Sequence, residues 1–107
     1  MVMEKQKILS ELKNLLLTHY GDYIDKVILY GSQSRGTATE DSDYDILIIL
    51  KEDYYWRFRS EILALTNDID LKYEVMTDIR MISAPELKTI KGKQPFILNA
   101  LEEGVVL

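Results

Sequence analysis

The sequence predicts a mixed α/β domain built on a small β-sheet, and three observations indicate it. A stripe of apolar residues recurs at spacings of three and four over residues 3–20, as in an amphipathic helix: Ile8, Leu9, Leu12, Leu15 and Leu16. Two short apolar runs, residues 27–30 and 45–50, have the length of strands. A second helical pattern follows over residues 52–72, so helices and strands share one layered domain.

The first half of the chain is punctuated by glycines. Gly21 ends the first helix as a C-terminal cap, and the strand over residues 27–30 ends at Gly31. Residues 32–39 are small and polar and predict a turn, with a short helix as the alternative. Residues 45–50 are nearly all apolar and rich in Ile, which suits a central strand buried on both faces.

The second half of the chain continues with further strand and helix patterns. We expect a third strand over residues 75–82 and a helix that starts with Ser83 as its cap and Pro85 in its first turn. Gly92 interrupts the chain, and a last helix over residues 95–103 is closed by Gly104. The predicted order is helix, strand, strand, helix, strand, helix.

Composition narrows the class of protein. The 107 residues suffice for one compact domain, residues 1–107, and the lack of Cys excludes disulfides and thiolate metal sites. No apolar run is long enough for a membrane span, and the N-terminus does not resemble a signal peptide, so we expect a cytoplasmic protein. The net charge is −5, with one basic cluster at Lys88, Lys91 and Lys93. Binding to extended nucleic acid is therefore not expected.

A candidate phosphate-binding segment follows the first strand. Gly31 lets the backbone turn sharply and approach a ligand, and Ser32 adds a hydroxyl and a backbone N–H. Arg35 could present a cationic fork to the same anion, and Gly36 permits tight packing. The alternative is that Gly31 and Ser32 form a plain turn.

Two carboxylates, Asp43 and Asp45, stand at the start of the next strand. Their spacing of two residues places both on one face of an extended chain. Divalent cations are the usual reason for such a pair, and Mg²⁺ prefers carboxylates together with phosphate oxygens. The sequence thus offers a phosphate cradle beside a metal platform, unless both carboxylates are simply solvated strand-entry residues.

Gly31-Ser32, ten intervening residues, and Asp43-Tyr44-Asp45 resemble the signature of the DNA polymerase β-like nucleotidyltransferase superfamily. The closer similarity is to its minimal nucleotidyltransferase (MNT) branch, and it extends over essentially the whole chain. The resemblance implies a mixed sheet with helices packed mainly on one face. It also implies that Gly31, Ser32, Arg35 and Gly36 bind the nucleotide and that three carboxylates bind the metals.

The third carboxylate is the least determined residue of that set. The resemblance places it on the next strand, where Asp78 lies within the run VMTDIRMI. A carboxylate inside an apolar run is energetically costly unless it has a partner, and a metal ion shared with Asp43 and Asp45 would be such a partner. An ion pair with Arg80, which shares its strand face, or simple edge exposure are the alternatives, and Asp70 and Glu74 are fallback ligands.

The resemblance implies a metal-dependent transfer of a nucleoside monophosphate, AMP from ATP, with Mg²⁺ as the metal and Mn²⁺ as a substitute. Stand-alone MNT proteins often pair with a helical HEPN protein in toxin–antitoxin modules, which suggests a protein hydroxyl, for example a tyrosine, as the acceptor. Two alternatives stay open, a catalytically inactive MNT-like module that neutralises a partner by contact and a nucleotide sensor. Aminoglycosides form a second acceptor class, but those enzymes usually carry a further helical domain.

An aromatic cluster near the second helix start has three interpretations. Trp56, Tyr54, Tyr55 and Phe58 could stack a nucleotide base, pack in the core, or form a surface for a partner.

Overall fold

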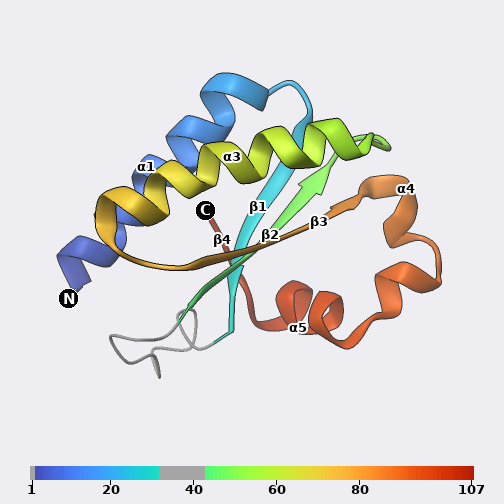
Figure 1. The fold of residues 1–107 in the computed structure, drawn as a ribbon. Coiled ribbons are helices and arrows are strands. Elements are labelled where there is room, and N and C mark those ends of the chain that lie inside the picture. Colours follow the sequence, from blue (N-terminus) through green and yellow to red (C-terminus); the bar gives the residue numbers. More distant parts are fainter. Residues whose placement is uncertain (1, 32–42) are drawn as a thin grey trace.

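The computed structural model describes residues 2–31 and 43–107. Its centre is a four-stranded sheet with the strand order β3-β2-β1-β4 (Figure 1). The strands are β1 (Ile24–Tyr30), β2 (Tyr44–Leu50), β3 (Thr77–Ser83) and β4 (Val105–Val106). β1 pairs antiparallel with both β2 and β4, whereas β2 and β3 run parallel. The prediction of a small mixed sheet is confirmed.

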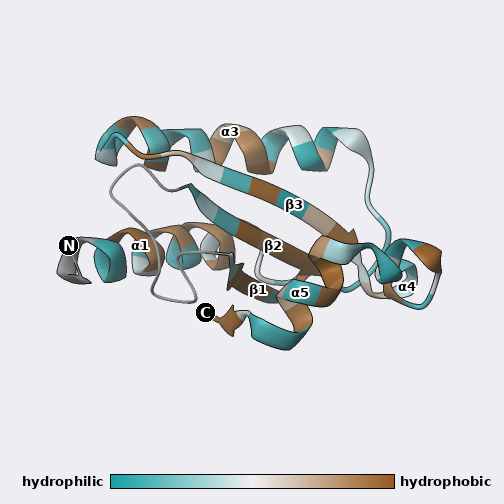
Figure 2. Ribbon diagram, turned by 90° about the horizontal axis from the view of Figure 1, so that it is seen from below, coloured by the Kyte–Doolittle hydropathy of each residue, from teal (hydrophilic) through white to brown (hydrophobic). Residues whose placement is uncertain are grey.

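The two long helices, α1 (Val2–Tyr20) and α3 (Trp56–Tyr73), lie side by side on one face of the sheet (Figure 1). The opposite face is covered by the shorter α5 (Pro95–Glu103), which follows α4 (Ala84–Leu87) and a 3-10 turn, η1 (Ile90–Lys93). Because strand side chains alternate, β2 serves both layers: Ile46 and Ile48 pack toward α1 and α3, and Leu47 and Ile49 pack toward α5. This explains why β2 reads as a continuous apolar run, coloured brown along most of its length in Figure 2.

Several helix and strand boundaries in the structure differ from the predicted ones. The second long helix begins at Trp56 rather than at residue 52, because the preceding link is held against the end of β3 instead of coiling. There Ser83 Oγ donates a hydrogen bond to Asp53 Oδ1 at 2.6 Å, and Tyr54 Oη donates one to the Met81 carbonyl at 3.2 Å. The third strand starts at Thr77, since Glu74 adopts a left-handed cap after α3 with φ 54°.

Other predictions are met closely. α5 spans the predicted residues 95–103, and Ser83 caps α4 in a capping box with Glu86. β1 extends three residues earlier than predicted, and β4, which follows Gly104, was not predicted at all. Within the described ranges, no helix combines the length and the apolar character that crossing a membrane requires.

Candidate functional site

Three strand ends meet at one end of the sheet. β2 and β3 both start there, and β1, which runs in the opposite direction, ends there. Asp45 of β2 lies in register with Asp78 of β3 on one side and with Tyr30 of β1 on the other. Residues in register on neighbouring strands project from the same face, so two carboxylates and a phenol stand side by side on the α5 face. We call Tyr30, Asp45, Asp78 and Arg80 the carboxylate end of the sheet.

Gly31 is packed directly on the Asp45 carboxylate. It has a left-handed backbone with φ 73°, and a Cβ built on it would lie 2.3 Å from Asp45 Oδ2. Any larger residue would therefore push the carboxylate away, besides adopting an unfavourable conformation. The sequence predicted that Gly31 approaches a ligand. The close contact in the structure is with the Asp45 side chain, and the approach to a ligand stays a prediction.

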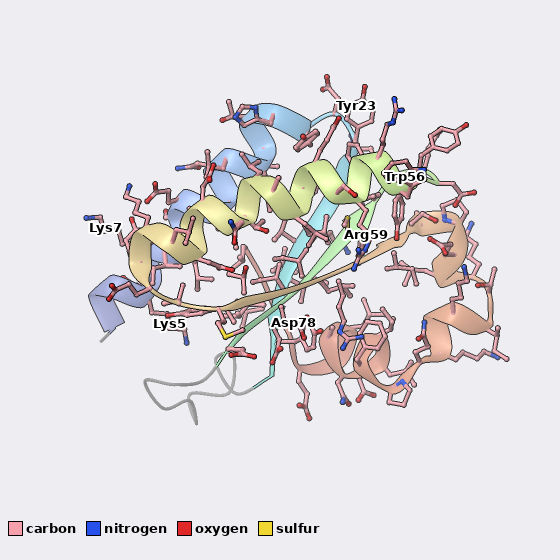
Figure 3. All side chains as sticks on the ribbon, in the orientation of Figure 1. Lys5, Lys7, Tyr23, Trp56, Arg59 and Asp78 are labelled. Atoms are coloured by element: carbon pink, nitrogen blue, oxygen red, sulfur yellow. The ribbon has the colours of Figure 1, made fainter. Side chains whose placement is uncertain are left out.

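Asp78 is paired with Arg80 on its own strand. The Arg80 Nε lies 3.7 Å from Asp78 Oδ2, and both side chains are about half exposed. The guanidinium also lies over the Phe96 ring of α5, 4.6 Å from its centroid. Figure 3 shows Asp78 on the α5 side of β3, near the end of β1. The sequence raised this ion pair as an alternative to metal binding, and the geometry allows both, because Asp78 still neighbours Asp45.

Tyr30 was not among the residues that the sequence indicated. Its side chain is buried, and burial together with the nearby Asp45 carboxylate raises its pKa to about 12, while Arg80 opposes the shift. The phenol therefore stays protonated and uncharged beside Asp45. The sequence signal for Tyr30 is its position directly before Gly31. Strand alternation then places its side chain on the face opposite to that of Leu29.

The other acidic residues that the sequence indicated lie outside the register of Asp45 and Asp78. Asp43 is exposed just before β2. Asp70 of α3 accepts hydrogen bonds from the Thr77 backbone N–H at 3.1 Å and from its hydroxyl at 2.9 Å, which fastens α3 to the start of β3. Burial raises the pKa of Asp70, the Thr77 bonds oppose this, and the charge of Asp43 adds to it. Because α3 packs on the other face, Asp70 is a structural residue; Glu74 is the exposed cap of α3.

Ser32, Arg35 and Gly36 lie outside the described residues. In the part of the chain that is described, no group of three Asp, Glu, His or Cys side chains is close enough to hold a metal ion. The Asp45–Asp78 pair nevertheless has suitable chemistry for a hard divalent cation, because such ions are often bound by one or two carboxylates plus substrate phosphates. The arrangement can therefore gather a cation and a phosphate chain beside Gly31.

The aromatic cluster lies far from this end. Trp56 is 73% exposed and Tyr55 is 84% exposed, so the core interpretation of these two rings is wrong. Phe58 and Tyr54 are only partly buried, at the edge of the core under α3. The cluster lies near the C-terminal end of β2, whereas Asp45 is at its N-terminal end. The base-stacking and partner-surface interpretations stay predictions.

Comparison with known proteins gives a consistent result. The family model "Nucleotidyltransferase domain" matches residues 6–107. Two proteins of Methanocaldococcus jannaschii, each named "Putative protein adenylyltransferase", are similar over nearly their whole length. The first is 37% identical over 105 residues, covering 98% of this chain and 99% of the relative. The second is 32% identical over 109 residues, covering 94% and 97%.

Solved structures share the fold. A protein named "putative minimal nucleotidyltransferase" superposes with a TM-score of 0.63 at 22% identity, covering 95% of this chain and 94% of the other. A chain from the toxin–antitoxin complex MntA–HpeT superposes with a TM-score of 0.62 at 19% identity, covering 92% and 69%. Gly31 is packed on the Asp45 carboxylate at one end of the sheet, and the family model matches nearly the whole length of the chain. The chain belongs to the nucleotidyltransferase domain family.

Proposed function

We propose that residues 1–107 form a single metal-dependent adenylyltransferase domain that moves AMP from ATP to a hydroxyl group of a partner protein. The observation that carries this proposal is the register of Asp45 with Asp78 on neighbouring parallel strands, with Gly31 packed on Asp45. The names of the relatives support a protein acceptor. The net charge of −5 also favours a protein over a nucleic acid as the partner.

The site residues would share the work of phosphoryl transfer. Asp45 and Asp78, with Asp43, would hold Mg²⁺ or Mn²⁺, which neutralises phosphate charge when bound. Gly31, Ser32, Arg35 and Gly36 would hold the phosphate chain through backbone N–H groups, a hydroxyl and a guanidinium.

Asp78 would also accept the proton of the acceptor hydroxyl. The hydroxyl oxygen then forms a bond to the α-phosphorus, the bond from that phosphorus to the bridging oxygen breaks, and pyrophosphate leaves. Protein groups in this scheme mainly position the reactants and balance charge.

The acceptor would be a tyrosine or another hydroxyl residue on a helical, HEPN-type protein, with this chain as the antitoxin of the pair in the cytoplasm. The structural likeness to the MntA–HpeT chain supports the fold part of this proposal.

A contact-only antitoxin is the second candidate. It is favoured by the Asp78–Arg80 ion pair, which satisfies Asp78 within its own strand. The shared face of Asp45 and Asp78 favours the enzyme, since a contact-only protein has no need of adjacent carboxylates.

The proposal is tested by transfer of label from α-labelled ATP, with Mg²⁺, to a helical protein whose gene adjoins the gene of this chain, where such a neighbour exists. We expect label on the partner with the wild type, and none with an Asp43→Asn/Asp45→Asn double variant or with Asp78→Asn. Asp68→Asn, an exposed acid on α3, is the matched control and should transfer normally. Tight complex formation without any label would instead support the contact-only antitoxin.

A further inference from the structure

A second hollow lies at the opposite end of the sheet from Asp45. It is a groove of about 430 Å³ between the turn that precedes β1 and the link from β2 to α3. Tyr23, Tyr54, Tyr55 and Phe58 supply its aromatic walls, and we call it the aromatic groove. Leu50, the last residue of β2, also lines it. Since Asp45 is five residues earlier, the groove is about 17 Å from the carboxylate end.

Tyr23, Tyr54 and Phe58 of the groove are held by contacts within the chain. Phe58 makes edge-to-face contacts with Tyr20 and Tyr23, at centroid distances of 5.0 and 5.6 Å. The Tyr54 hydroxyl donates to the Met81 carbonyl, and the Lys51 backbone N–H donates to the Tyr23 carbonyl at 2.9 Å. These contacts hold the groove open without any ligand, so an occupant would meet a preformed surface.

The rings remain accessible although their frame is fixed. Tyr23 is 61% exposed and Tyr55 is 84% exposed. Figure 3 shows Tyr23 and Trp56 at the end of the molecule away from Asp78. Exposed aromatic rings around a hollow are uncommon on a free surface and mark interaction sites.

The rim of the groove is acidic. Among the described residues that line it, Asp22, Glu52 and Asp53 carry three negative charges and Lys51 carries one positive charge. A negative rim repels phosphate, so the groove does not suit a nucleotide or nucleic acid. Aromatic faces combined with carboxylates favour a cation, because a guanidinium or ammonium is attracted by both. The same region already contains such a contact, with Arg57 lying 5.8 Å from the centre of the Trp56 ring.

We propose that the aromatic groove binds an arginine or lysine side chain of a protein partner and so serves as a docking site for a basic segment of that partner. This inference rests on the proposed function in taking the partner to be the acceptor of AMP. Binding of the partner's basic segment to the groove does not itself require AMP transfer. Docking about 17 Å away from Asp45 would leave the carboxylate end open for the acceptor hydroxyl.

The test uses the full chain carrying Asp45→Asn and Asp78→Asn, so that its outcome does not depend on catalysis. The probe is a fluorescein-labelled, capped five-residue peptide, Gly-Arg-Leu-Arg-Gly, and a peptide with Glu in place of Arg is the control. We expect anisotropy to report binding of the Arg peptide only. In heteronuclear NMR spectra of the chain, the shifts it causes should be confined to residues 22–24 and 50–58.

Two variants separate the contributions of rings and charge. Tyr23→Ser with Tyr55→Ser should weaken binding of the Arg peptide about tenfold, because two cation–π faces are lost. Ile90→Ser, at a side chain that is 83% exposed elsewhere, is the matched control and should bind normally. Glu52→Lys should weaken binding more than Asp68→Lys, although both change the net charge equally.

If Glu52→Lys and Asp68→Lys weakened binding equally, the proposal would be overturned, because binding would then depend only on long-range electrostatic attraction. NMR shifts centred outside the groove, or binding of the Glu peptide, would also overturn it. A loss of label transfer in the groove variants is not required, so failure of docking and failure of the proposed activity are distinguishable.

Discussion

The two faces of the sheet differ in what they are built from. The face toward α1 and α3 is apolar along β2 from end to end, from Tyr44 to Leu50. The face toward α5 is apolar at Leu47 and Ile49, but its row on β2 begins with Asp45, beside Asp78 and the buried Tyr30. The difference indicates that one face supplies stability, whereas the other combines a smaller core with the proposed site.

The largest expected effect follows from the apolar face. Ile48→Ala should lower the free energy of unfolding by about 2–5 kcal/mol, because it leaves a cavity under α1 and α3. Chemical denaturation checks this value. Transfer per folded molecule should stay close to that of the wild type, and Asp45→Asn should show the reverse pattern. If Ile48→Ala removed activity while fully folded, the division between the two faces would be wrong.

The carboxylate face should give the protein a pH-dependent stability at high pH. The pKa of Tyr30 is raised from 10.0 to about 12, so its contribution is present below pH 10 and is lost as pH rises toward 12. Two pKa units correspond to about 2.7 kcal/mol as an upper order of magnitude. Denaturation between pH 9 and 12 should therefore show a steeper loss in the wild type than in Tyr30→Phe. Parallel curves for the two proteins would rule out this account of Tyr30.

Gly31→Ala should act on the carboxylate face alone. The added Cβ would meet Asp45 Oδ2 at 2.3 Å, and the positive φ costs about 1–3 kcal/mol for a residue with a side chain. We expect a modest loss of thermal stability together with a large loss of transfer. Gly21→Ala, at a glycine distant from Asp45, is the control for a general loss of stability. Normal transfer by Gly31→Ala would show that the Asp45 carboxylate tolerates displacement.

The smallest effect concerns the junction that carries the chain from β3 to the α5 side. Ser83 is fully buried, accepts a hydrogen bond from the Glu86 backbone and donates one to Asp53. Ser83→Ala should cost about 1–2 kcal/mol of stability without changing transfer. Thermal unfolding measured beside a transfer assay checks both halves of the prediction, and an unchanged melting temperature would contradict the first.

The sequence predicted local features better than neighbour relations. The limits of α5 and the cap at Ser83 could be predicted because Pro95, Gly104 and Ser83 act on their own segments. β4 escaped prediction, since two valines carry no periodicity and pair only because β1 offers a free edge. The start of α3 was misplaced because tertiary contacts to Ser83 and Met81 hold the preceding link extended.

The same limit applies to the candidate site. Gly31, Asp43 and Asp45 could be proposed as site residues from their spacing, but the register of Asp45 with Asp78 depends on β3 pairing parallel to β2. Tyr30 carried no motif, and its altered pKa arises from burial and from charges on two other strands. Groups brought together by strand pairing cannot be read from one segment alone.

Binding of ATP in the presence and absence of Mg²⁺, measured by calorimetry, tests the central claim most directly because it needs no acceptor. The wild type and the Asp68→Asn control should bind ATP with Mg²⁺ and much more weakly without it. Asp45→Asn and Asp78→Asn should each lose about tenfold or more in Mg²⁺-dependent affinity. Equal binding by all four proteins, with or without Mg²⁺, would contradict the assignment of Asp45 and Asp78 as the metal-binding pair.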